Sequence, residues 1–169
     1  MRTTVLRIAV VLSFFVSTLS ASAQDFDKAI AMNDYFVSIT DSLYSGGQQW
    51  GRQFNEAYQT KDFKLLVPAR QKMEKFIDQK LALLGKMKDS FGSENLRLTT
   101  MDFLAFEKKL ITEAFIPLEK LNKNSTQEEI KKAMNNLTET AAKETAELTR
   151  VNKAQEEFAE KNGFTIEKE

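Results

Sequence analysis

Residues 125–164 read STQEEIKKAMNNLTETAAKETAELTRVNKAQEEFAEKNGF, and this segment has the periodicity of a long amphipathic helix. Its apolar side chains recur at spacings near three and four residues, which is the period of one helix face. They are Ile130, Met134, Leu137, Ala141, Leu148, Val151 and Phe158. Asn162-Gly163 is typical of a helix end, and Phe164 beyond the glycine can fold back onto the helix. We therefore expect one helix over residues 125–162.

The start of this helix carries a second signal. A capping box pairs a Ser or Thr with a Glu three residues later, so that each side chain bonds to the backbone of the other residue. Two overlapping pairs fit this pattern, Ser125 with Glu128 and Thr126 with Glu129.

Three further amphipathic segments precede this helix. They span residues 25–58, 63–91 and 94–121. Pro68 removes a backbone donor near the start of the second segment, which predicts a kink or a separate first turn. Gly92-Ser93 predicts the end of the second helix and the cap of the third. Pro117 predicts a bend in the last turn of the third.

The residue balance also favours helix over strand. Residues 24–169 contain 14 Leu and 13 Ala against 7 Ile and 3 Val, and Leu and Ala are strong helix formers. Short breaks between long helices make consecutive helices antiparallel neighbours. We therefore expect an all-α fold, an up-down-up-down antiparallel four-helix bundle. A two-helix hairpin that dimerises is the alternative.

The first 23 residues have the features of a cleaved signal peptide. Arg2 and Arg7 make a positive start, residues 8–19 are apolar, and residues 21–23 (Ala-Ser-Ala) fit a signal-peptidase site. An uncleaved membrane anchor is the alternative, but the run of about 12 apolar residues is short of the roughly 20 that span a bilayer. We expect the mature domain to be 24–169, periplasmic or secreted. The chain has no Cys, so it is not a lipoprotein.

Composition excludes several kinds of chemistry. The chain of 169 residues has 24 basic and 24 acidic side chains, no His and no Cys. These counts exclude zinc fingers, Cys–His nucleophiles, a Ser-His-Asp triad and histidine-ligated haem. The zero net charge argues against nucleic-acid binding. We expect no cofactor, metal or catalytic residues, and we expect Glu139, Glu144 and Glu147 to lie on a solvated surface.

The segment from Tyr44 to Gly51 is the least helix-like part of the first helix. Three glycines within six residues each cost on the order of 1 kcal/mol relative to Ala in a helix. The structural interpretation is a close helix crossing with Trp50 in the core. The functional interpretation is a notch beside an aromatic anchor, a feature that binding sites use. The candidate binding residues are Tyr44, Gly46, Gly47 and Trp50.

Polar side chains interrupt the apolar stripes of three helices. They are Asn33, Thr40, Lys108, Glu144 and Gln155. We expect the stripes to rotate so that these side chains reach solvent. A buried pair between Glu144 and Lys108 is the alternative, and it would need good geometry to offset desolvation.

Residues 32–37 (MNDYFV), with Trp50 two helical turns past Leu43, resemble uncharacterised exported helical-bundle proteins of Gram-negative bacteria. The resemblance extends to the signal peptide, the length and the four-helix layout. It implies an envelope or secreted protein and carries no catalytic residues over.

The leading hypothesis is an exported, non-enzymatic bundle that acts by protein–protein interaction in the cell envelope, with a chaperone as one version. The alternative is a carrier of a small apolar ligand held between helices near Trp50, which predicts a cavity of at least about 300 Å³. An enzyme that uses carboxylates, Lys or Tyr alone is the third hypothesis, and it requires acids that converge in a cleft.

Overall fold

The computed structural model describes the backbone of residues 4–166 and the side chains of residues 24–166. Within these residues every regular element is helical and no strand occurs, so the predicted all-α class is confirmed. The elements are α1 (Thr4–Thr60), the 3-10 turn η1 (Phe63–Leu66), α2 (Val67–Leu84), α3 (Glu94–Leu110), the π-helical segment η2 (Ile111–Phe115), α4 (Ile116–Glu119), α5 (Gln127–Ala141) and α6 (Glu144–Lys161). The expected signal peptide lies outside the part whose side chains are described.

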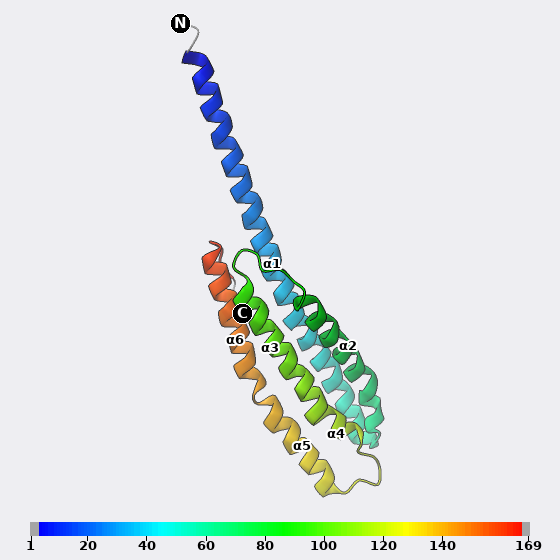
Figure 1. Ribbon diagram of the computed structural model, residues 1–169. Coiled ribbons are helices and arrows are strands. Elements are labelled where there is room, and N and C mark those ends of the chain that lie inside the picture. The colour runs from blue at the N-terminus through cyan, green and yellow to red at the C-terminus, as the bar shows by residue number, and fades with distance from the viewer. Residues whose placement is uncertain (1–3, 167–169) are drawn as a thin grey trace.

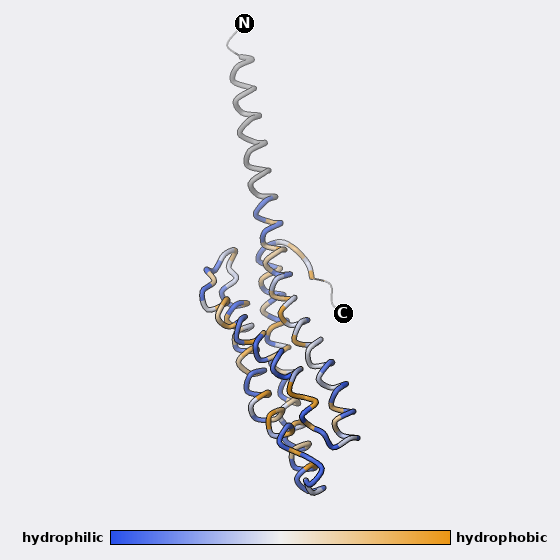
Figure 2. Tube along the Cα trace, turned by 90° about the vertical axis from the view of Figure 1, so that its right-hand side faces the viewer, coloured by the Kyte–Doolittle hydropathy of each residue, from blue (hydrophilic) through white to orange (hydrophobic). Residues whose placement is uncertain are grey.

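The helices pack side by side in an elongated bundle. In Figure 1 the chain descends along α1, returns along α2, descends along α3 and returns along α5 and α6. The most extensive helix–helix contact joins α3 to α6, while α2 contacts both α1 and α3, and α1 also contacts α6. Apolar and polar residues alternate along the helices in Figure 2. Each helix can therefore turn an apolar face toward its neighbours.

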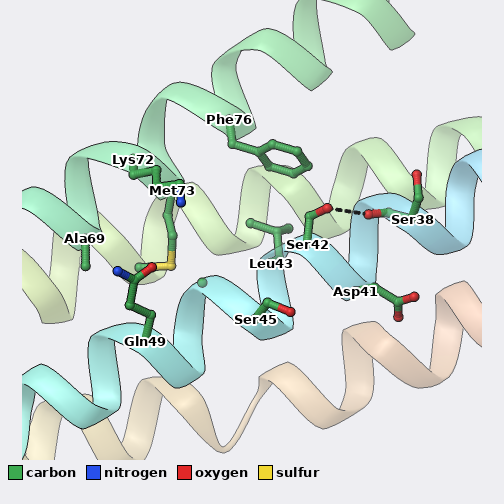
Figure 3. Close-up of a pocket in the computed structure, with 11 residues that line it drawn as sticks. Ser38, Asp41, Ser42, Leu43, Ser45, Gln49, Ala69, Lys72, Met73 and Phe76 are labelled. Carbon is green, nitrogen blue, oxygen red and sulfur yellow. Dashed lines mark hydrogen bonds between the residues drawn. The ribbon is translucent and has the colours of Figure 1, made fainter.

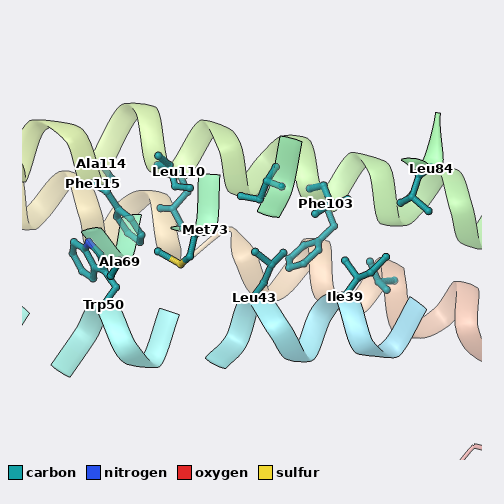
Figure 4. Packing of buried hydrophobic residues seen from close by; sticks show 14 of the residues in the cluster. Ile39, Leu43, Trp50, Ala69, Met73, Leu84, Phe103, Leu110, Ala114 and Phe115 are labelled. Carbon is teal, nitrogen blue, oxygen red and sulfur yellow. The ribbon is translucent and has the colours of Figure 1, made fainter. Parts of the chain in front are cut away.

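The core runs along the length of the bundle. Figure 4 shows the ring of Phe103 from α3 lying between Leu43 and Ile39 of α1. The largest fully buried side chains are Phe36, Phe63, Phe103, Ile39, Leu66, Ile77, Leu84, Leu96, Leu104, Ile111, Leu118 and Val151. Removing such side chains from water is the main source of stability in a fold without disulfides.

The second helix begins as predicted and ends earlier than predicted. η1 forms a separate turn, its start capped by the Asp62 side chain, and Pro68 lies in the first turn of α2, where its missing N–H is harmless. α2 ends at Leu84, not near residue 91, because the poor helix former Gly85 follows and residues 86–90 are largely polar.

The turn before α3 differs from the expected cap. Gly92 does adopt the left-handed conformation, with φ of 76°. The buried Ser93 does not cap α3 with its side chain; its Oγ instead accepts the N–H of Ser90 at 3.2 Å. Pro117 lies in the first turn of α4, and the π-helical segment η2 precedes it.

The segment expected as one helix over 125–162 is two helices. Thr126 and Glu129 form the capping box, which confirms one of the two candidate pairs. The helix then breaks at Ala142 and Lys143. Glu144, which interrupts the apolar stripe, is the first residue of the second of these helices.

The end of α6 follows the expected pattern. Gly163 has φ of 75°, its N–H donates to the carbonyl of Glu160, and the N–H of Phe164 donates to that of Ala159. This is a Schellman motif. The ring of Phe164 then lies edge-on to Phe158, with 6.1 Å between centroids, which confirms that the chain folds back.

Candidate binding groove between α1 and α2

The four candidate residues on α1 point in different directions. Successive residues of a helix are about 100° apart, so a segment of this length samples all faces. Tyr44 is 69% exposed and Trp50 is 5% exposed. Gly47 is exposed, and a Cβ atom on it would have nothing within 4 Å, whereas Gly46 faces α2. The structure therefore does not bring the four together into one site.

Trp50 lies in the core. Its ring stacks on Phe115, with 4.0 Å between centroids and 10° between planes, and on Phe54 at 5.5 Å and 19°. Figure 4 shows Trp50 beside Phe115 and Ala114. Its buried Nε1 has no hydrogen-bond partner within the described residues. Trp50 thus has the packing role of the structural interpretation.

Gly46 lies directly against a side chain of α2. A Cβ atom on Gly46 would lie 2.8 Å from Cγ and 3.0 Å from Sδ of Met73. The absent side chain therefore leaves room for Met73 against the backbone of α1. The close crossing expected for this glycine-rich segment forms at Gly46 and not at Gly47.

A groove of about 530 Å³ opens between α1 and α2 beside Gly46. We call it the α1–α2 groove, and Figure 3 shows its lining. The lining residues are Ser38, Asp41, Ser42, Leu43, Ser45, Gly46, Gln49, Ala69, Lys72, Met73 and Phe76. Its apolar members, Leu43, Met73 and Phe76 among them, are buried or half-buried, and Ser38 and Ser42 on its rim are exposed.

The serine hydroxyls along the rim are set up as acceptors. Ser38 Oγ donates to the carbonyl of Tyr35 at 2.7 Å, and Ser42 Oγ donates to the carbonyl of Ser38 at 2.6 Å. With each proton held by the helix, the oxygen lone pairs remain for a donor from outside. Neither bond supplies a base that could activate a hydroxyl as a nucleophile.

Glu107 of α3, which the sequence analysis did not single out, interacts with Glu144 of α6. Burial, and secondarily the charge of Glu144, raise the pKa of Glu107 to about 8, and burial also raises the pKa of Glu144. Glu107 Oε1 is buried without a hydrogen-bond partner in the described structure. Phe103, Glu107 and Leu110 have the spacing of a core stripe, which was the available signal.

Some of the polar residues that interrupt the apolar stripes reach solvent as expected, and others do not. Lys108 reaches solvent and pairs with Asp78 on α2 at 2.6 Å, so it does not pair with Glu144. Asn33 and Gln155 are 5% and 7% exposed, which contradicts the prediction that they reach solvent. Of the three acids expected on a solvated surface, Glu139 is exposed. Glu144 and Glu147 are half-buried, so that prediction is wrong for these two.

The described residues contain no group of three or more acidic side chains placed to hold a metal ion. No helix among them has the length and apolar character needed to cross a bilayer. No protein-family model, curated protein or solved structure matches this chain, so the groove and the chemistry of its lining are the basis for assigning a function.

Proposed function

We propose that this chain is an exported, non-enzymatic protein that acts by binding another protein of the cell envelope through the α1–α2 groove. The observation that carries the proposal is the groove itself. Met73 and Phe76 belong to its apolar lining, and serine hydroxyls that can accept hydrogen bonds lie along its rim. An apolar centre within a polar rim is the usual arrangement of a protein interface, and here the apolar side chains form the floor of the groove.

The same proposal takes the molecule to be an up-down-up-down four-helix bundle released from a signal peptide. Short connections and the contacts of α2 with α1 and α3 support the topology. Export rests on the basic start, the short apolar run and the Ala-Ser-Ala site of residues 1–23. The resemblance to exported helical bundles of Gram-negative bacteria agrees with both.

The groove fits an amphipathic segment of a partner. An apolar side chain would lie against Met73 and Phe76, and donors of the partner would face the lone pairs of Ser42. The rim carries one charge of each sign, Asp41 and Lys72, which favours a partner with mixed charge. The chaperone version has less support, because Met73 and Phe76 are themselves buried or half-buried and exposed apolar residues are needed to hold unfolded chains.

The carrier of a small apolar ligand is the second candidate. The groove volume of about 530 Å³ exceeds the roughly 300 Å³ of small ligand sites. Two features weigh against it. The ring of Trp50 is buried and stacked with Phe54 and Phe115. The groove is also open, whereas ligand sites bury most of the surface of what they bind.

Photocrosslinking in the native host tests the proposal. A photoreactive residue replaces Ser45 inside the groove, and a matched variant replaces Gln48, which is exposed on the same helix and does not line the groove. We expect one discrete protein adduct at position 45, absent at position 48 and abolished by Ser42→Trp, which fills the groove.

Native mass spectrometry of the protein isolated from its host separates the two candidates. A bound mass of a few hundred daltons that is lost on Ser42→Trp, with no adduct at position 45, would replace the interaction function by the carrier. Equal adducts at positions 45 and 48 would show that the groove does not select a partner.

A further inference from the structure

A second pocket lies between α1 and α6, and most of the residues that line it are polar. It has a volume of about 420 Å³, and we call it the α1–α6 pocket. The residues that line it are Ile30, Asn33, Asp34, Val37, Thr40, Asp41, Asn152, Gln155, Phe164, Thr165 and Ile166. Asp41 also borders the α1–α2 groove, and the two sites otherwise share no residue.

Three polar residues that interrupt the apolar stripes of the sequence meet in this pocket. Asn33 and Thr40 come from α1, and Gln155 comes from α6. Asn33 and Gln155 are more than nine-tenths buried, and Thr40 is half-buried. Polar side chains at such positions destabilise a bundle unless their groups are satisfied. The pocket therefore gathers polar groups from two helices, and among these three residues Asn33 has a buried polar atom without a partner in the described structure.

One buried atom defines what that partner must offer. Asn33 Oδ1 is fully buried and has no hydrogen-bond partner within the described chain. A carbonyl oxygen can only accept, so it requires a donor. Thr40 Oγ1 already donates to the carbonyl of Val37 at 2.8 Å, which leaves its lone pairs for a donor as well.

The charged residues of the pocket also favour a ligand that donates hydrogen bonds. Asp34 and Asp41 lie about two helical turns apart on α1, and no Lys or Arg belongs to the described lining. A site with two carboxylates and unfilled acceptors favours a cation that carries N–H groups. Ile30 and Val37 add apolar wall beside it, suited to the methylenes next to such a group.

Phe164 anchors the start of the far wall of the pocket. Phe164, Thr165 and Ile166 follow the Schellman turn at Gly163. The ring of Phe164 lies edge-on to Phe26 of α1, with 6.3 Å between centroids, and to Phe158 of α6. A wall fixed in advance reduces the entropy lost when a ligand is ordered.

We infer that the α1–α6 pocket binds an organic cation with N–H donors, a primary ammonium or guanidinium group, through Asn33 Oδ1 and the carboxylates of Asp34 and Asp41. The same chemistry is carried by free polyamines and by Lys or Arg side chains of peptides. The inference does not rest on the proposed function of the α1–α2 groove, although the two sites share Asp41.

Calorimetric titration of the mature protein tests the inference with three probes. Spermidine represents free polyamines, and a capped Gly-Lys-Gly peptide represents protein side chains. Tetramethylammonium carries a single positive charge without a donor. We expect spermidine or the peptide to bind at least about tenfold more tightly than tetramethylammonium, because a donor to a buried acceptor contributes about that much. Whichever of spermidine and the peptide binds more tightly identifies whether the natural ligand is a free polyamine or a protein side chain.

Variants test whether the binding occurs in the α1–α6 pocket. Asn33→Leu should weaken binding by about tenfold or more and raise the melting temperature of the unliganded protein, because an unpaired buried acceptor is removed. Asp34→Asn, at an exposed position, should weaken binding without altering the fold, whereas Asp27→Asn, which removes an exposed charge from α1 outside the pocket, should not. Binding that is equal for all three cations, absent for all, or unchanged in Asn33→Leu and Asp34→Asn would overturn the inference.

Discussion

Gly46 on α1 and Met73 on α2 meet so closely that a Cβ atom on the glycine would lie 2.8 Å from Cγ of the methionine. Both residues line the α1–α2 groove. Gly47, the next residue, has nothing within 4 Å of the corresponding position. Neighbouring glycines in one helix therefore have different physical roles.

Substitution of the two glycines should separate these roles. Gly46→Leu should lower the free energy of unfolding by about 1–3 kcal/mol, because the side chain overpacks the crossing. Gly47→Leu should leave it unchanged or raise it by up to about 1 kcal/mol, since Leu is the better helix former. Urea denaturation followed by circular dichroism measures both. Equal effects of the two changes would mean that α1 and α2 do not cross at Gly46.

The acid pair between α3 and α6 predicts a dependence of stability on pH. The pKa of Glu107 is about 8 in the folded protein and near 4.5 in the unfolded chain. The folded state therefore holds a proton that the unfolded state has released between these values. Stability from this group is fully present below pH 4.5 and falls as the pH rises through 8, by up to roughly 5 kcal/mol.

Glu107→Gln should remove this dependence. The amide keeps the shape of the protonated acid, so the variant should melt at a clearly higher temperature than the wild type at about pH 8 and at about the same temperature at about pH 5. Melting curves across this range provide the measurement. Glu160→Gln is the matched control, because it removes an exposed carboxylate of α6. A parallel pH profile for Glu107→Gln and the wild type would contradict the burial of Glu107.

The turn after α6 predicts a position-specific effect of side-chain shape. Gly163 has φ of 75° and open space around it, so a substitution there is limited by the backbone alone. Gly163→Val should destabilise by about 1–2 kcal/mol, since β-branched residues strain the left-handed conformation. Gly163→Asn, which tolerates it, should cost much less. Similar losses for both substitutions, measured by thermal unfolding, would indicate a steric cause instead.

Local features of the fold were predictable where neighbouring residues alone determine them. The capping box at Thr126, the separate turn before Pro68 and the Schellman turn at Gly163 each depend on a few consecutive residues. The early end of α2 was less predictable, because the apolar spacing continues through Met87 to Phe91, which pack on the core from outside a helix.

The candidate sites could not be predicted in full, because they depend on contacts between helices and the periodicity of a sequence does not specify such contacts. The glycine-rich segment drew attention to α1, but which glycine faces α2 depends on the rotation of the helix. Asn33 and Gln155 were recognised as interruptions of apolar stripes, yet their meeting in one pocket required the register between α1 and α6. Glu107 was missed because a single acid among apolar residues is usually accommodated by exposure.

An ion pair that is largely shielded from solvent joins α2 to α4. Arg70 donates from Nε and Nη2 to the two carboxylate oxygens of Glu119, both at 2.9 Å, and from Nη1 to Glu74 at 2.8 Å. The side chains of Arg70 and Glu119 are 12% and 8% exposed. This paired geometry offsets the desolvation of both charges as long as both partners are present.

Arg70→Leu should therefore be among the most harmful single changes in the bundle. It leaves Glu119 buried without its partner, which costs about 3–5 kcal/mol, whereas the double variant Arg70→Leu with Glu119→Leu should recover much of the loss because no charge remains buried. Lys108→Ala, which breaks the exposed pair with Asp78, should cost less than about 1 kcal/mol. A double-mutant cycle by chemical denaturation measures the coupling. If the double variant is as unstable as the two single losses added together, the lost packing of the long side chains, and not the stranded carboxylate, accounts for the effect.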